Sequence, residues 1–357
     1  MNKEQTLSMI EELSNARGLS GFEDDVVSIL RLRCAGLGEL SEDAMRNFYV
    51  RRPGGGGGPV LQLDAHSDEV GFMVRAIRPN GTLEFIPLGG WAAPSVPSHK
   101  VVVRNREGTY IPGIIASKPP HYLSEAERKA VPEISTMAID IGASSDREVR
   151  EDYRIPIAAP VLPDAAFEYR ARHDIMIGKA FDNRLGCAAL AAVLRELAGE
   201  ELGVRITGAF AVQEEMGLRG ATVTARTVAP DIAVSFEGCP ADDTVVEPYA
   251  VQTALKKGPM LRHIDARMIT NPRFQRFALD IAAAKGVPVQ EGVRTGGSTN
   301  GGVIHLSGKA VPVIVIGVPV RYIHTHYGIA SYADFENAVT LACAVIRALN
   351  ATVVKSF

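Results

Sequence analysis

The chain has 357 residues, with 38 lysines and arginines against 41 aspartates and glutamates, so its formal net charge is −3. This balance argues against a nucleic-acid-binding protein, and the 46% hydrophobic content argues against a disordered chain. The length predicts two domains, or one large domain with an insertion. No apolar stretch reaches the roughly 18 residues that a membrane helix needs, so we expect no contact with a membrane.

Cysteine usage and the polar start of the chain predict where the protein works. The four cysteines are too scattered for a disulfide framework, and no CxxC pair occurs. No apolar segment of a signal peptide follows the polar first residues. We therefore expect a protein of the reducing cytoplasm.

Apolar residues at helical spacing predict one helix that ends near Gly18 and a second that begins near Glu23. The glycine run 54–58 lacks the Lys-Ser/Thr pair of a phosphate-binding loop, so we interpret it as a flexible hairpin loop. Residues 60–63 then form a short apolar run that predicts a buried strand.

The middle of the chain changes to short strand-like runs separated by glycine, proline and asparagine turns. The predicted strands are 72–77, 83–87, 100–104, 111–116, 137–141 and 155–158. The stretch 117–134 is polar and contains proline, which predicts a long exposed loop. We interpret residues 71–163 as a small all-β domain inserted into an α/β domain made of residues 1–70 and 164–357.

The α/β pattern returns near Lys179. The predicted strands are 204–212, 231–236 and 311–318, and the predicted helices are 184–197, 271–285 and 334–349. Asp182 and Asn183 precede the first of these helices and are expected to cap it. Strands that alternate with helices predict a mixed, mostly parallel sheet sandwiched between helices.

Histidine and acidic side chains follow the ends of four predicted strands, and one aspartate opens a predicted helix. These residues are His66, Asp68, Asp182, Glu214, Glu215, Glu237 and His324. Functional sites in open α/β sheets form beyond the carboxyl ends of the strands, so we expect these groups to meet. Imidazole and carboxylate ligands are typical of catalytic Zn²⁺ or Co²⁺, and this number of ligands suits two ions.

Each of these residues also has a simpler interpretation. A Glu-Glu pair such as Glu214-Glu215 is usually a solvated turn, a lone histidine is usually structural, and Asp182 alone is most simply a helix cap. The metal interpretation depends on the coincidence of all these positions. Within it, one glutamate of the pair can coordinate while the other acts as general base, and Asp68 can orient the imidazole of His66.

Together, these segments resemble the tetrahedral (TET) aminopeptidase family of dinuclear metallo-aminopeptidases, which includes glutamyl and deblocking aminopeptidases. The matching stretches are Leu63–Met73, Lys179–Arg184, Gln213–Gly217, Glu237–Gly238 and Arg321–Thr325, in the same order. The resemblance implies a cytoplasmic exopeptidase with a zinc-exopeptidase-like catalytic domain. It also implies that the inserted β-domain serves assembly into a homo-oligomer, often a hollow dodecamer.

The resemblance further implies a role for each candidate metal ligand. One ion would be held by His66 and Glu237, and the other by Glu215 and His324, with Asp182 bridging them. The two divalent ions would be Zn²⁺ or Co²⁺, and Mn²⁺ is also suitable.

In the same pattern, Glu214 is the general base that activates a water shared by the ions, and Asp68 is the partner of His66. The implied reaction removes N-terminal residues from peptides. Two alternatives stay open on the sequence. One is an N-acyl amino-acid deacylase or other amidohydrolase on the same metal centre, and the other is a non-catalytic, metal-binding oligomeric scaffold.

Two residues depart from the family pattern. Glu237 stands where many relatives have aspartate, and its longer side chain can still coordinate. Asn300 replaces an acid near the expected substrate pocket. Because a neutral amide attracts an ammonium group less than a carboxylate does, we expect a shifted substrate preference.

Overall fold

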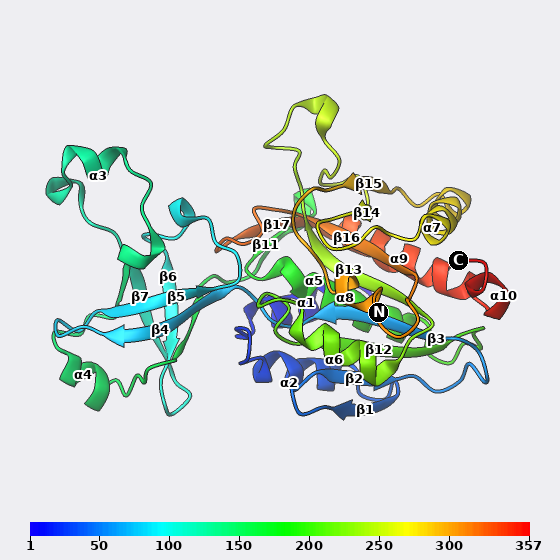
Figure 1. Ribbon diagram of the computed structural model, residues 1–357, viewed down its shortest axis with the longest axis horizontal. Helices are drawn as coiled ribbons and strands as arrows, with labels where there is room; N and C mark the ends of the chain where they lie inside the picture. Colours follow the sequence, from blue (N-terminus) through cyan, green and yellow to red (C-terminus); the bar gives the residue numbers. More distant parts are fainter.

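The computed structural model describes residues 1–357 and consists of an α/β sandwich with a small β-barrel projecting from one end (Figure 1). The large sheet has 11 strands. They are β1 Glu39–Glu42, β2 Phe48–Arg51, β3 Val60–His66, β10 Glu168–Arg170, β11 Ile175–Gly178, β12 Arg205–Ala211, β13 Ile232–Pro240, β14 Met260–Ile264, β15 Gln290–Val293, β16 Val313–Arg321 and β17 Gly328–Ser331.

The centre of this sheet is parallel. Strands β12, β3, β13 and β16 lie side by side in that order and run in the same direction. Strands β2 and β17 flank them and are antiparallel to their neighbours, so the sheet is mixed. Strand β14 is antiparallel to β16 and pairs in parallel with β15. The predicted fold class is confirmed, and the carboxyl ends of the four central strands meet at one edge.

The glycine run is a loop, but the predicted hairpin is wrong. Residues 54–58 connect β2 to β3, and these two strands are not neighbours. Strand β12, which comes much later in the sequence, lies between them and pairs with both. Short-range sequence patterns cannot reveal such an insertion.

Helices cover both faces of the sheet. Their bounds are α1 Lys3–Asn15, α2 Asp24–Arg33, α5 Phe181–Glu196, α6 Arg219–Val228, α7 Pro272–Lys285, α8 Gly301–Ile304, α9 Tyr332–Ala348 and α10 Ala351–Val354. Helices α1, α5 and α9 pack together on one face, and α6 and α8 pack on the other (Figure 1). No helix is both long and apolar enough to cross a membrane.

Burial on both faces explains the apolar runs of the central strands. In β13, Val234 and Phe236 belong to the large core beneath α5, whereas Ala233 belongs to a smaller core on the opposite side. Because successive side chains of a strand point to opposite faces, both sets of positions must be apolar. This requirement is the signal that located these strands in the sequence.

The barrel is antiparallel and closed. Its strands are β4 Gly71–Ile77, β5 Leu83–Leu88, β6 Lys100–Arg104, β7 Tyr110–Ala116, β8 Ala138–Asp140 and β9 Pro160–Pro163. The predicted strand 155–158 is wrong: Ala158 has a positive φ of 65°, and the strand forms after it. Residues 117–134 are largely exposed, as predicted, and contain the short helix α3 (Glu125–Lys129). A second short helix, α4 (Asp146–Glu151), precedes β9.

A buried ionic network joins the end of α1, the exit from β3 and the start of α5. The Glu69 carboxylate accepts hydrogen bonds from Lys179 Nζ at 2.7 and 2.8 Å and from Arg184 Nη2 at 3.0 Å. None of the three side chains is more than 4% exposed. Both cations also donate to backbone carbonyls at and just beyond the end of α1. The network therefore fixes three segments that are far apart in the sequence.

We expect Glu69→Gln to lower the free energy of unfolding by about 3–5 kcal/mol, because it leaves two buried cations without a counter-charge. Urea denaturation at fixed protein concentration measures this change. The control is Glu125→Gln, which removes an exposed carboxylate paired with Lys129 and should change stability little. A Glu69→Gln variant as stable as the wild type would contradict the proposed importance of the network.

Candidate metal centre

The residues predicted at strand ends converge at the carboxyl edge of the four central strands. His66 is the last residue of β3, and the pair 214–215 follows β12. Glu237 lies inside β13, because the pairing with β16 continues to Pro240 beyond the predicted strand end. His324 lies in the turn between β16 and β17, and Asp182 lies at the start of α5.

Two groups of candidate ligands share one aspartate, and a third brings Glu214 and Glu215 close to His66. In the first group, His66 Nε2 lies 3.0 Å from Asp182 Oδ1 and 3.2 Å from Glu237 Oε1. In the second, His324 Nε2 lies 3.4 Å from Asp182 Oδ2 and 3.3 Å from Glu215 Oε1. The two oxygens of Asp182 therefore face different groups.

The donor atoms fit divalent metal ions in chemistry and in spacing. Ligand atoms about 2.0–2.1 Å from a tetrahedral ion lie roughly 3.3–3.4 Å from one another, close to the separations within each group. The second carboxylate oxygen of Glu237, Oε2, is buried and has no hydrogen-bond partner. Imidazole nitrogens and carboxylate oxygens suit Zn²⁺, Co²⁺ or Mn²⁺.

The acidic groups draw positive charge to this edge of the sheet. Burial raises the pKa of Glu237 to about 8 and raises the pKa of Glu214 well above its ordinary value. Burial alone would lower the pKa of His324, but the carboxylates of Asp182 and Glu215 raise it to about 11. Protons or metal cations are therefore needed to stabilise these contacts.

Asp68 contacts both His66 and the turn that carries Glu214 and Glu215. Its carboxylate is fully buried, and Oδ1 lies 3.4 Å from His66 Nδ1. The same carboxylate accepts hydrogen bonds from the backbone N–H groups of Glu214 (2.9 Å) and Glu215 (3.1 Å), and from Ser20 Oγ (2.6 Å). Asp68 thus holds the turn that carries both glutamates, a contact that the sequence did not reveal.

The two predicted capping residues have different roles. Asn183 Oδ1 accepts hydrogen bonds from the N–H groups of Gly186 and Gly238, both at 3.0 Å, so it caps the regular part of α5 and ties it to β13. Asp182 makes no capping hydrogen bond, and its carboxylate faces the two histidines instead. The capping prediction is therefore confirmed for Asn183 and wrong for Asp182.

Asn300 follows closely on Ser298, which lines the site, but its own side chain does not face a substrate. Its side chain is fully buried, and Nδ2 donates a hydrogen bond to Asp64 Oδ1 at 2.7 Å. Burial raises the pKa of Asp64 to about 6, and the amide is its closest polar partner. An acid at position 300 would face a second carboxylate rather than a substrate ammonium group.

A cavity of about 410 Å³ opens onto the candidate ligands. Its other charged lining residues are Arg262, Arg267 and Arg294. Arg262 pairs with Asp265 at 3.1 Å and Arg294 pairs with Asp242 at 2.7 Å, whereas Arg267 is exposed and has no ion pair. No sequence motif marks these arginines, so their place in the cavity could not be predicted from the sequence.

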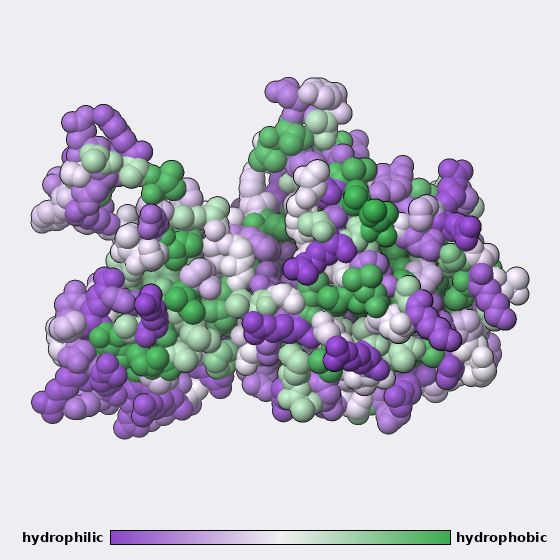
Figure 2. Space-filling view, in the orientation of Figure 1, coloured by the Kyte–Doolittle hydropathy of each residue, from purple (hydrophilic) through white to green (hydrophobic).

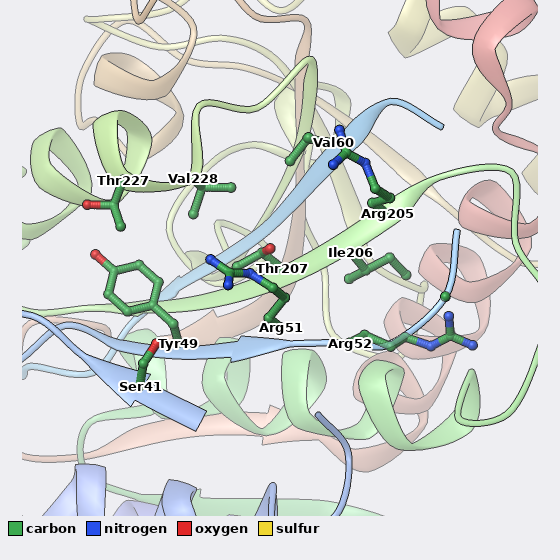
Figure 3. Close-up of a pocket in the computed structure, with 11 residues that line it drawn as sticks. Ser41, Tyr49, Arg51, Arg52, Val60, Arg205, Ile206, Thr207, Thr227 and Val228 are labelled. Atoms are coloured by element: carbon green, nitrogen blue, oxygen red, sulfur yellow. The ribbon is translucent and has the colours of Figure 1, made fainter. Parts of the chain in front are cut away.

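A second cavity, of about 440 Å³, lies among β2, β12 and α6 near the amino ends of β3 and β12 (Figure 3). Its lining holds Arg51, Arg52 and Arg205, but no histidine, cysteine or acid. Arg52 donates to backbone carbonyls after α5, and Arg205 Nε donates to the carbonyl of Gly58. This cavity therefore lacks the histidine, cysteine and carboxylate side chains that bind metal ions.

This chain is similar to known proteins in both sequence and fold. The M42 glutamyl aminopeptidase family matches residues 46–341. The chain is 34% identical over 344 residues to a glutamyl aminopeptidase of Lactococcus lactis subsp. cremoris (strain MG1363), covering 96% of each chain. A TET aminopeptidase from the marine sediment archaeon Thaumarchaeota archaeon SCGC AB-539-E09 superposes with a TM-score of 0.94, 36% identity and 99% coverage of both chains.

A dodecameric structure, PhTET1-12s, also superposes over 98% of this chain and 100% of its own, with a TM-score of 0.86 and 26% identity. These matches confirm the predicted resemblance to TET aminopeptidases, and they extend over the sandwich and the barrel alike. The chain is a peptide hydrolase and belongs to the M42 glutamyl aminopeptidase family.

Proposed function

We propose that this chain removes N-terminal residues from peptides with two divalent metal ions, Zn²⁺ or Co²⁺, with Mn²⁺ also suitable. The observation that carries the proposal is the Asp182 carboxylate, whose oxygens lie 3.0 Å from His66 Nε2 and 3.4 Å from His324 Nε2. When bound, such ions polarise the scissile carbonyl and lower the pKa of water. Family membership favours this reaction over deacylation or a non-catalytic scaffold.

Glu214 is the proposed general base. Its Oε2 atom lies 4.0 Å from His66 Nε2, whereas Oε1 of its neighbour Glu215 lies 3.3 Å from His324 Nε2. Glu214 is therefore the glutamate that stands further from the candidate donors. Its raised pKa, caused by burial, suits a group that takes a proton from the attacking water and returns it to the leaving amine. Asp68 positions this residue through its backbone N–H.

Residues 71–163 are the proposed assembly domain, inserted into a catalytic domain of residues 1–70 and 164–357. The barrel exposes Ile86 and Ile114, which are 42% and 50% exposed and would be covered by a second copy. A homo-oligomer such as the dodecamer of PhTET1-12s is consistent with this surface. All four cysteines are buried and unpaired, which supports a reducing, cytoplasmic location.

The arginines of the cavity support a preference for acidic N-terminal residues. With Asp182, Glu215 and Glu237 engaged by metal ions and Glu214 acting as the general base, the other charged groups of the lining are Arg262, Arg267 and Arg294. A carboxylate on the first residue of a peptide would meet these guanidinium groups. The name of the Lactococcus relative, a glutamyl aminopeptidase, agrees with this preference.

We expect Glu214→Gln to lower kcat by about 10²–10⁴-fold while metal content stays at the wild-type level, because the amide keeps the shape but cannot accept the proton. Glu215→Gln should instead lower metal occupancy, and excess metal should restore part of its rate. Elemental analysis and turnover of a peptide substrate, measured on both purified variants, separate the two roles.

The opposite pattern, in which Glu214→Gln loses metal and Glu215→Gln keeps it, would reverse the assignment of the two glutamates. If neither substitution changed turnover, the pair would be an ordinary solvated turn and the proposed site would be wrong.

We expect Arg267→Gln to lower kcat/KM for glutamyl p-nitroanilide by about 10–100-fold, the scale of a lost hydrogen bond to a charged group. The value for leucyl p-nitroanilide should change little, because its first residue carries no carboxylate. Arg226→Gln, which removes an exposed arginine of α6 outside the cavity, is the matched control. Equal losses for the two substrates would refute the acidic preference.

A further inference from the structure

A segment of the barrel lies directly against the metal centre. His324 Nδ1 donates a hydrogen bond to the carbonyl oxygen of Gly90 at 2.9 Å, which leaves Nε2 facing Asp182 and Glu215. A Cβ on Gly90 would lie 3.1 Å from His324 Nδ1. A Cβ on Gly89 would lie 3.1 Å from Glu215 Oε2. Glycine therefore permits the barrel backbone to touch two candidate ligands of one ion.

The turn that carries His324 has an unfavourable backbone conformation. Tyr322 and His324 have φ values of 63° and 57°, in the left-handed region that non-glycine residues avoid. Such residues persist only where their surroundings hold them. Within the turn, Thr325 Oγ1 lies 2.8 Å from the carbonyl oxygen of Tyr322 and 2.9 Å from that of Tyr327, and its one hydrogen can bond to either. The same oxygen accepts a hydrogen bond from the backbone N–H of Tyr327 at 3.2 Å. These bonds fix the shape of the turn but not its position.

Aromatic side chains of the barrel hold the position of the turn that carries His324, because they pack against His326. The His326 ring, only 1% exposed, stacks on His99 with 3.9 Å between ring centroids and 14° between planes. The Trp91 ring is tilted against the His326 ring, with 5.3 Å between their centroids. Trp91 also stacks on Phe72 at 4.7 Å and donates a hydrogen bond from Nε1 to the carbonyl of Gly71. Neither ring nitrogen of His326 has a hydrogen-bond partner, so the ring acts through packing.

We propose that the barrel positions His324, and so sets the affinity of the ion held by Asp182, Glu215 and His324, independently of any role in assembly. The proposal rests on the two-ion centre described under the proposed function. Gly90, His99 and His326 are positioning residues in this account. Outer contacts of this kind typically change metal affinity or activity by about 10–100-fold when they are removed.

The test is a titration of metal-free full-length chain with Co²⁺, followed by visible absorption and calorimetry, which separate the two binding steps. We expect His99→Ala and His326→Ala to weaken one binding step by about 10–100-fold and to leave the other at the wild-type value. His326→Phe should recover most of the loss, because stacking does not need the ring nitrogens. His121→Ala, an exposed histidine of the same barrel, is the matched control.

If either alanine variant fails to fold, Gly90→Ala perturbs the same contact in another way. We expect it to weaken the same binding step. Light scattering must give an unchanged assembly size in every variant used. A wild-type chain that binds fewer than two Co²⁺ ions would overturn the proposed function. The role of the barrel would be overturned if the wild type bound two ions and the variants either bound both ions as tightly as the wild type or lost both together.

Discussion

The fold must hold four carboxylates close together, and largely out of water, at one edge of its large sheet. Asp182, Glu214, Glu215 and Glu237 lie at one edge of the sheet, within reach of two imidazoles and largely shielded from water. Burial raises the pKa of Glu237, and repulsion from the neighbouring carboxylate of Asp182 adds to this effect. The arrangement is therefore stable only where cations complete it and where the surrounding protein holds each side chain in place.

Three sets of contacts outside the donor atoms provide that support. The buried Glu69 network fixes the exit of β3 and the start of α5, so it fixes His66 and Asp182. Asp68 fixes the turn of the two glutamates through their backbone N–H groups. The barrel reaches His324 through the carbonyl of Gly90. Each contact joins segments that are distant in the sequence, so the site depends on the whole fold.

The sequence predicted the parts of this structure that leave a local pattern. Apolar runs located β3, β12, β13 and β16, because these strands are buried on both faces. Short outer strands such as β10, β11 and β17 were missed, since four or fewer residues carry too little pattern and their pairing is decided by distant partners. The same limit applies to the site. Its candidate ligands are chemically distinctive, but the contacts that hold them are not local in the sequence. Glu69 lies 115 positions from its partner Arg184, and Gly90 lies 234 positions from its partner His324.

Metal reconstitution shows whether peptide hydrolysis by this chain requires two ions. Chain stripped of metal by a chelator is titrated with Zn²⁺ or Co²⁺, while bound metal is measured by elemental analysis and release of the first residue of a peptide by mass spectrometry. The account predicts no turnover without metal, full turnover at two ions per chain, and no cleavage of the same peptide when its N-terminus is acetylated. Full turnover with one ion or none, or equal cleavage of the acetylated peptide, would contradict it.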